Sequence, residues 1–236
     1  MGFVPSVGTS APAPPAPPAG TAGTVGTAVR SAIFSTRFVL MWMMFFCNIS
    51  AGISIIGFQS PMMQELLRRV RPELSSAALS GAGAALIAAS SLFNGLGRFF
   101  WGALSDRIGR TAAFRFMLGS QIAVFAALML SGNPWIFAAL ICYVLLCYGG
   151  GFGTMPSFVL DSFGAAIMPS VYGGILTAWS AAGVIGPQIV ALIQDHYPRQ
   201  ASTLSFLVGA GFLSLGLVMA LLLRKPAAQK AGVRGA

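Results

Sequence analysis

Long apolar stretches separated by short polar segments make up most of the chain. A helix needs about 20 predominantly apolar residues to cross roughly 30 Å of hydrocarbon, and lipid leaves such a segment no other way to satisfy its backbone. The pattern predicts an all-α, polytopic membrane domain over residues 36–224, with six transmembrane helices at 38–60, 79–104, 112–131, 134–158, 171–193 and 201–223. The connections are short, except at 61–78 and 159–170.

The two ends of the chain have a different composition. Residues 1–35 are rich in Pro, Ala, Gly and Thr, and this composition is typical of a disordered or polyproline-like tail. Residues 225–236 form a short basic tail. The first charged residue is Arg30, so no cleaved secretory signal is expected.

Composition and charge support a membrane protein. Only 8% of the residues are charged and 56% are hydrophobic, whereas soluble domains carry about 25% charged residues. The net charge of +9 comes from basic residues at span ends and in tails, so it does not indicate nucleic-acid binding. Nine Lys and Arg residues lie on the side that carries both termini, and four on the other. This bias predicts a protein of the cell membrane with both termini in the cytoplasm.

Arg98 lies well inside a predicted span, whereas the other basic residues lie at span ends, in loops or in tails. Its guanidinium is always charged and offers five donors in a planar fork, which matches a carboxylate in two-point contact. The next acidic residue along the same segment, Asp106, is about two turns on. Two interpretations follow: the side chain snorkels toward the cytoplasmic end or bonds helix-terminal carbonyls, or it faces a central cavity and binds an anionic substrate.

Other polar or amphipathic residues within the spans are candidates for the same site. They are Asn48, Asn94, Tyr148 and Trp179. For the aromatic side chains, the alternative to lining a substrate site is that they only pack between helices.

A short polar turn is predicted from Ser105 to Arg110. Asp106 could cap the following helix, and the nearby arginines could pair with Asp106 or with lipid phosphate. The turn is therefore interpreted either as a topology anchor or as a latch that holds one conformer shut. The residues assigned to this gating loop are Gly102, Asp106, Arg107, Gly109 and Arg110.

Glycine and proline mark two further segments. The cluster Gly149–Gly153, followed by Pro156, predicts a loosened, close-packed end to the fourth span. Gly183, Gly186 and Pro187 predict a kink in the fifth span. Tight packing alone and helix flexing during transport both remain open for these segments.

Catalytic and metal-binding signals are weak. No HExxH or GxSxG motif occurs, and the single histidine, His196, is expected in a loop. Cys47, Cys142 and Cys147 lie in apolar stretches and are interpreted as buried small hydrophobic residues. No enzyme activity, metal site or cofactor is predicted, and Asp161 is interpreted as a loop residue.

Several motifs resemble one transporter family. The sequence GALSDRIGR at 102–110 resembles the loop signature of the major facilitator superfamily, found between the second and third helices of each six-helix half. Four further segments indicate one family within this superfamily. They lie around Trp42 and at Asn94–Trp101, Gly150–Pro156 and Tyr172–Pro187. Together they are similar to the carboxyl-terminal half of the oxalate/formate antiporter family over about residues 36–224.

The resemblance implies one half of a facilitator-type bundle that works by alternating access. In such families the arginine of this half's second helix contacts the substrate carboxylate, which would be Arg98 here. The oxalate exchanger also uses a lysine in the penultimate helix, but residues 165–196 contain no Lys or Arg. One cation suits a monocarboxylate, related to formate or lactate, better than the oxalate dianion.

Six spans supply only half of such a cavity. The expected partners are therefore a small carboxylate, the lipid bilayer, and either a second six-helix half or a parallel second copy of this chain. The alternative function is a non-transporting remnant or accessory subunit that pairs with a separate amino-terminal half.

Overall fold

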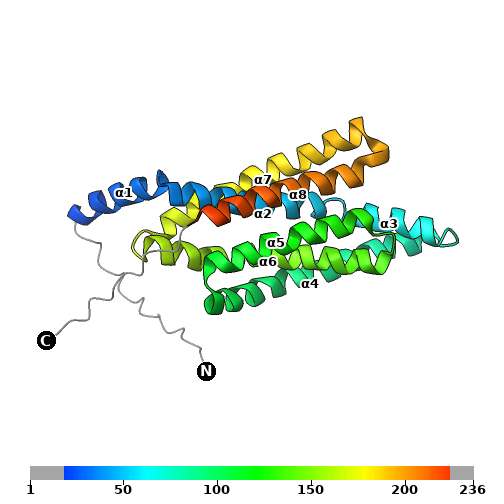
Figure 1. Ribbon diagram of the computed structural model, residues 1–236, viewed down its shortest axis with the longest axis horizontal. Helices are drawn as coiled ribbons and strands as arrows, with labels where there is room; N and C mark the ends of the chain where they lie inside the picture. Colours follow the sequence, from blue (N-terminus) through cyan, green and yellow to red (C-terminus); the bar gives the residue numbers. More distant parts are fainter. Residues whose placement is uncertain (1–18, 224–236) are drawn as a thin grey trace, which may run out of the picture.

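The computed structural model of the protein describes residues 19–223, which fold into helices joined by short turns (Figure 1). The helices lie roughly along one long axis, and α3 and the α4–α5 junction lie at opposite ends of the bundle. The elements in chain order are α1 (Ala19–Ile33), α2 (Thr36–Ile56), α3 (Gln59–Val70), α4 (Ser76–Ile108), α5 (Arg110–Leu130), α6 (Pro134–Phe163), α7 (Met168–His196), the 3-10 turn η1 (Pro198–Gln200) and α8 (Ala201–Leu222).

Six helices are long and apolar enough to cross a membrane, as the hydropathy pattern predicts. They are α2, α4, α5, α6, α7 and the segment from η1 through α8. Several extend beyond the predicted span because polar residues continue the helix outside the apolar stretch. Helix α4, for example, has 33 residues, a length of about 50 Å at 1.5 Å per residue.

Two helices were not predicted. Residues 19–33, assigned to a disordered tail, form α1, which begins after the proline-rich segment and places Ala32 in the core. Residues 1–18 and the predicted basic tail lie outside the described residues. The predicted connection 61–78 contains most of α3, an amphipathic helix that buries Met63 and Leu67. Helix α3 contains many polar residues, so it does not stand out as an apolar stretch in the sequence.

Short polar residues begin three of the helices. The hydroxyl of Ser35 accepts a hydrogen bond from the backbone N–H of Phe38 at the start of α2, and Ser75 does the same for Ala78 at the start of α4. The side-chain oxygen of Asn133 accepts bonds from the first two donors of α6. These contacts satisfy backbone donors that have no partner within the helix.

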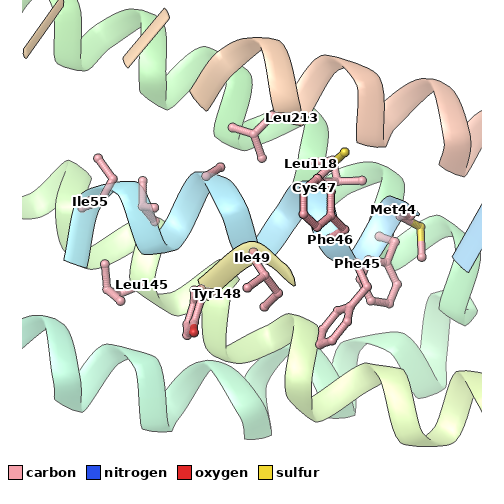
Figure 2. Packing of buried hydrophobic residues seen from close by; sticks show 14 of the residues in the cluster. Met44, Phe45, Phe46, Cys47, Ile49, Ile55, Leu118, Leu145, Tyr148 and Leu213 are labelled. Carbon is pink, nitrogen blue, oxygen red and sulfur yellow. The ribbon is translucent and has the colours of Figure 1, made fainter. Parts of the chain in front are cut away.

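Helix α2 is the centre of the bundle. In its apolar stretch of 18 residues, 61% of the residues are buried inside the protein, the highest share among the six spans. Phe45, Cys47 and Ile49 are fully buried, and their side chains leave α2 in different directions to meet the surrounding helices (Figure 2). Helix α2 therefore contacts α6, α7 and α8 at once.

The closest helix pair is α4 and α6, and glycines make their approach possible. A Cβ atom at Gly97 would lie 2.8 Å from the carbonyl carbon of Leu146, and one at Gly153 would lie 2.7 Å from the Cα of Arg98. A Cβ at Gly149 would overlap the carbonyl oxygen of Asn94. We call this contact, formed by Gly97, Gly149, Gly150 and Gly153, the glycine seam. Small residues at such positions let two backbones pack directly against each other within a membrane.

The glycine seam corrects one prediction. The cluster Gly149–Gly153 was expected to loosen the end of its helix, but α6 continues through it and through Pro156 to Phe163. The predicted close packing is present. At these glycines α4 occupies the space that side chains would otherwise fill, and this packing supports the continuous helix α6.

Replacing Gly149 with Ala tests the seam. The added methyl group overlaps the α4 backbone, so Gly149→Ala should lower the free energy of unfolding by about 1–3 kcal/mol, as overpacking of an interior does. Thermal unfolding in detergent measures the effect. The control is Gly81→Ala on α4, where a Cβ meets nothing within 4 Å; it should leave the midpoint unchanged or raise it slightly, because alanine favours helix. Equal unfolding midpoints for the two variants would contradict the direct backbone packing at the glycine seam.

Candidate functional site

Arg98 lies within its membrane span. It is ten residues before the end of α4 at Ile108, which corresponds to about 15 Å along the helix axis. The last residues of α4 are polar and continue the helix beyond the apolar stretch, so Arg98 lies six residues, or roughly 9 Å, inside the end of that stretch at Leu104. The guanidinium therefore starts from within the span rather than from a helix end.

The guanidinium of Arg98 packs against an aromatic cluster. Its central carbon lies 5.5 Å from the ring centre of Phe152 on α6, within cation–π range. The Phe152 ring in turn lies 5.4 Å from Tyr148 and 6.0 Å from Trp179 on α7, measured between ring centres. Three predicted site residues, Arg98, Tyr148 and Trp179, thus meet around Phe152.

No protein carboxylate neutralises Arg98 within residues 19–223. The three ion pairs found there involve other arginines, and no hydrogen bond from the Arg98 side chain is present in that part of the chain. The guanidinium donors therefore remain available to an anion.

Arg98 and Trp179 lie on the two least covered spans. Only 22% of the residues in the apolar stretch of α4 and 28% of those in α7 are buried, against 56% for α6. The side chains of Arg98 and Trp179 are both exposed. We call the exposed surface around Arg98 and Trp179 the open face.

Asn94 lies one turn before Arg98 and packs against Gly149 of the glycine seam. Its side-chain oxygen is buried without a hydrogen-bond partner, and a Cβ at Gly149 would come within 2.6 Å of it. The amide is half-buried against α6. It is close enough along α4 to share the Arg98 site.

The structure places Asn48 elsewhere. It is fully buried on α2, and its side-chain oxygen accepts a 2.9 Å hydrogen bond from Gln121 on α5. Polar side chains paired in this way join helices inside a membrane. Asn48 therefore ties α2 to α5 rather than lining the open face, because its helix is surrounded by the others.

The predicted flexing residues lie in a continuous helix. Gly183, Gly186 and Pro187 are all within α7. Gly186 packs against α2, where a Cβ would lie 3.3 Å from Ile53, whereas Gly183 has nothing within 4 Å. Helix flexing at these positions stays a prediction.

The predicted polar turn is shorter than expected. Helix α4 continues to Ile108 and α5 begins at Arg110, so only Gly109 separates them. Gly109 has φ +90°, a backbone conformation that side-chain-bearing residues rarely adopt. A single glycine therefore replaces the expected six-residue turn, and no side chain caps α5, so Asp106 does not act as its cap.

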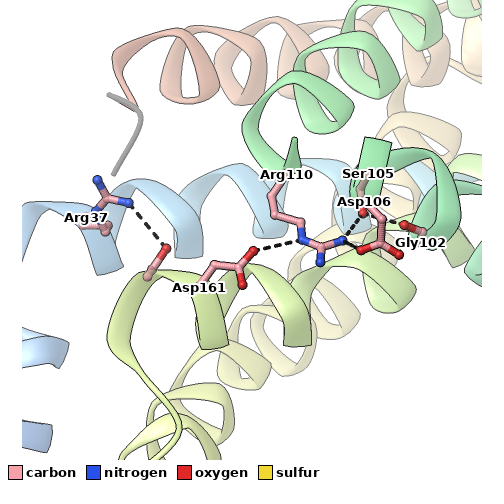
Figure 3. A network of polar contacts seen from close by, with 7 residues as sticks. Arg37, Gly102, Ser105, Asp106, Arg110 and Asp161 are labelled. Atoms are coloured by element: carbon pink, nitrogen blue, oxygen red, sulfur yellow. Dashed lines mark hydrogen bonds and ion pairs between the residues drawn. The ribbon is translucent and has the colours of Figure 1, made fainter. Parts of the chain in front are cut away.

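Arg110 is the centre of a polar network at this junction (Figure 3). It donates a 3.1 Å bond to Asp161 at the end of α6. It also pairs with Asp106 and donates to the hydroxyl of Ser105, whose own proton goes to the carbonyl of Gly102. These contacts join the end of α4, the start of α5 and the end of α6.

Two assignments in this region change. The Arg107 side chain is exposed and forms no ion pair or hydrogen bond with the residues that the structure describes. Of the two arginines, Arg110 is therefore the one that joins the helices at this junction. Asp161 was expected in a loop, but it lies in the last turn of α6. The histidine His196 likewise ends α7 instead of lying in a loop.

Sequence reasoning missed Phe152 and Asp161 as members of these clusters. Phe152 is the one aromatic residue within the glycine cluster, where a ring has room to reach a neighbouring helix, and this signal could have identified it. The partnership of Asp161 with Arg110, 51 positions apart, has no local signal. Between residues 19 and 223, no group of three or more His, Cys, Asp or Glu residues is placed to hold a metal ion.

The described fold is that of a multi-pass α-helical membrane protein with six candidate spans and an arginine within one of them. The family model of the Major Facilitator Superfamily matches residues 3–187. The chain belongs to this family of transporters, which confirms the resemblance found in its motifs.

One curated relative gives a narrower comparison. The chain is 30% identical over 114 residues to the oxalate:formate antiporter of Oxalobacter formigenes. The matched stretch covers 47% of this chain and 27% of that protein. The chain is thus similar to about a quarter of the length of this relative.

The Arg110 network can be tested by a double-mutant cycle. Arg110→Ala and Asp161→Ala should show a coupling energy of about 0.5–1 kcal/mol in unfolding experiments, because the two side chains contact directly but are partly solvated. The matched cycle with Arg107→Ala and Asp161→Ala should show no coupling. A coupling as large for Arg107 as for Arg110 would contradict the observed pairing.

Proposed function

We propose that the chain is part of a transporter for small organic anions, and that Arg98 binds the carboxylate of the substrate. The observation that supports this function is an arginine within a membrane span, on the open face, without a protein carboxylate among the described residues. Keeping a charge at this depth is costly, and such residues are usually functional. A substrate carboxylate would satisfy the planar fork of the guanidinium by two-point contact.

The aromatic cluster is suited to hold the guanidinium in place. A cation–π contact contributes about 0.5–2 kcal/mol, depending on desolvation, and it uses none of the N–H donors for hydrogen bonds. Phe152, Tyr148 and Trp179 would form the wall beside the bound anion. Their apolar surface suits the small hydrocarbon part of a monocarboxylate.

The charge count favours a monocarboxylate over a dicarboxylate. Helix α7 contributes Trp179 to the aromatic cluster beside Arg98, and it contains no Lys or Arg. A second carboxylate would therefore have no cation from this helix. We expect formate-like or lactate-like anions to be preferred to oxalate, and exchange of one anion for another is the expected mode.

A second six-helix half is expected to cover the open face. Facilitator-type transport places the substrate between two halves that rock about a midplane site. The uncovered sides of α4 and α7 fit such a contact, and either a separate amino-terminal half or a parallel second copy could supply it. In this mechanism the Arg110 network would latch one end of the bundle in one of the two conformers.

Uptake by vesicles tests the role of Arg98. Labelled formate, lactate and oxalate are offered to vesicles that contain the chain, alone and together with an amino-terminal half. Arg98→Ala should lower monocarboxylate uptake roughly tenfold or more, because hydrogen bonds to a charged group contribute about 1.5–3 kcal/mol each. Arg98→Lys should also impair uptake, since the planar fork is lost.

The matched control is Arg199→Ala, an exposed arginine in η1 at the far end of the bundle. It should leave uptake unchanged. Unchanged uptake by Arg98→Ala, with normal membrane insertion, would remove Arg98 from the site. No uptake by the unmodified chain in any combination would favour the non-transporting accessory role.

The proposed orientation has both termini in the cytoplasm of a cell membrane. The expected readout is labelling of single cysteines by an impermeant thiol reagent in intact cells, after the three native cysteines are replaced. A cysteine at Arg107, beside the α4–α5 junction, should be protected, and one at Glu73, between α3 and α4, should react. The reverse pattern would contradict the orientation.

A further inference from the structure

A large apolar cavity lies at the end of the bundle opposite the Arg110 network. It has a volume of about 590 Å³ and lies between α3, α4 and the start of α6. We call it the α3 cavity; Leu67, Arg71, Ala85, Ala89, Trp135 and Cys142 are among its lining residues. Its volume is within the range of about 300–1,000 Å³ typical of ligand pockets.

The helix packing explains why this space is empty of side chains. The glycine seam holds α4 and α6 together from Gly97 onward. Toward the other end of both helices the α4 residues that line the cavity are mostly alanines, such as Ala82, Ala85 and Ala89. Alanine is too short to fill the gap between three helices, so an apolar hollow remains.

Arg71 provides the one charged side chain that lines the α3 cavity. The Arg71 side chain is exposed, and it forms no ion pair or hydrogen bond with residues 19–223. On α3 itself, Arg69 is neutralised by Glu65 at 2.8 Å. With Arg68 and Glu73 included, this segment carries three basic and two acidic residues, and so a net charge of +1.

The cavity extends from a helix end into the membrane. Trp135 is in the first turn of α6 and is 75% exposed, and tryptophan is enriched at the level of the lipid headgroups. Cys142 lies seven residues further along α6, about 10 Å deeper. The α3 cavity thus has a polar end with a free cation and an apolar interior at hydrocarbon depth.

We propose that the α3 cavity binds an anionic phospholipid, with one acyl chain between α3, α4 and α6 and the phosphate at Arg71. The cation lies at the rim and the remaining lining is almost entirely apolar, which complements an amphiphile with a single anionic headgroup. An arginine near the membrane surface attracts an anionic headgroup by charge. This site is separate from the open face, so its occupant is not the transported anion.

Fluorescence quenching by brominated lipids tests the proposal on the full chain in vesicles. The emission of Trp135 is obtained as the difference between the chain and its Trp135→Phe variant. Brominated phosphatidylglycerol should half-saturate the quenching at a mole fraction roughly fivefold lower than brominated phosphatidylcholine. This factor corresponds to about 1 kcal/mol for one arginine near a membrane surface.

Two pairs of variants separate the α3 cavity from general membrane contact. Arg71→Gln should abolish the preference for phosphatidylglycerol, whereas Arg199→Gln, at the same end of the bundle but outside the cavity, should retain it. Ala85→Leu should remove the saturable quenching by filling the cavity, and Ala88→Leu, which does not line it, should not. Equal half-saturation by the two lipids would overturn the proposal. It would also be overturned if both arginine variants lost the preference for phosphatidylglycerol equally, or if both leucine variants lost the saturable quenching equally.

Discussion

The backbone contact between α4 and α6 determines the geometry of the candidate site. At Gly153 the α6 backbone packs directly against the Cα of Arg98, so the neighbouring ring of Phe152 necessarily lies beside the guanidinium. Any side chain at the seam would separate the two helices and move the ring away. Toward the other ends of the two helices, where α4 carries alanines, the α3 cavity forms. Helix α4 thus carries both the exposed Arg98 and part of the lining of the α3 cavity.

The architecture could be predicted because hydropathy depends on local composition. Six apolar stretches gave six spans, since no other backbone structure is stable across lipid. The helix ends were less predictable. Polar residues after Leu104 continue α4 outside the apolar stretch, and Gly109 turns the chain in one residue with φ +90°. Helix α3 was missed because its apolar residues form only one face of a short helix.

The site could be predicted only where one residue carries the signal. Arg98 stands out because a charge within an apolar span has few explanations. Its contact with Phe152 and the partnership of Arg110 with Asp161 depend on how distant segments pack, and spacing along the chain does not encode that. Asn48 differs from Arg98: a polar residue in a span suggests a cavity, but α2 is central and the side-chain oxygen of Asn48 accepts a hydrogen bond from Gln121.

The most direct test of the account is a solid-state NMR measurement on the protein in bilayers. Dipolar couplings from the ¹⁵N-labelled guanidinium of Arg98 to the ¹³C carboxyl of labelled formate, and to the ³¹P of lipid, show which anion it contacts. The account predicts a close contact with the carboxyl carbon that is lost in Arg98→Lys, and no close contact with phosphorus. A guanidinium close to lipid phosphorus, with no carboxylate contact at saturating formate, would contradict it.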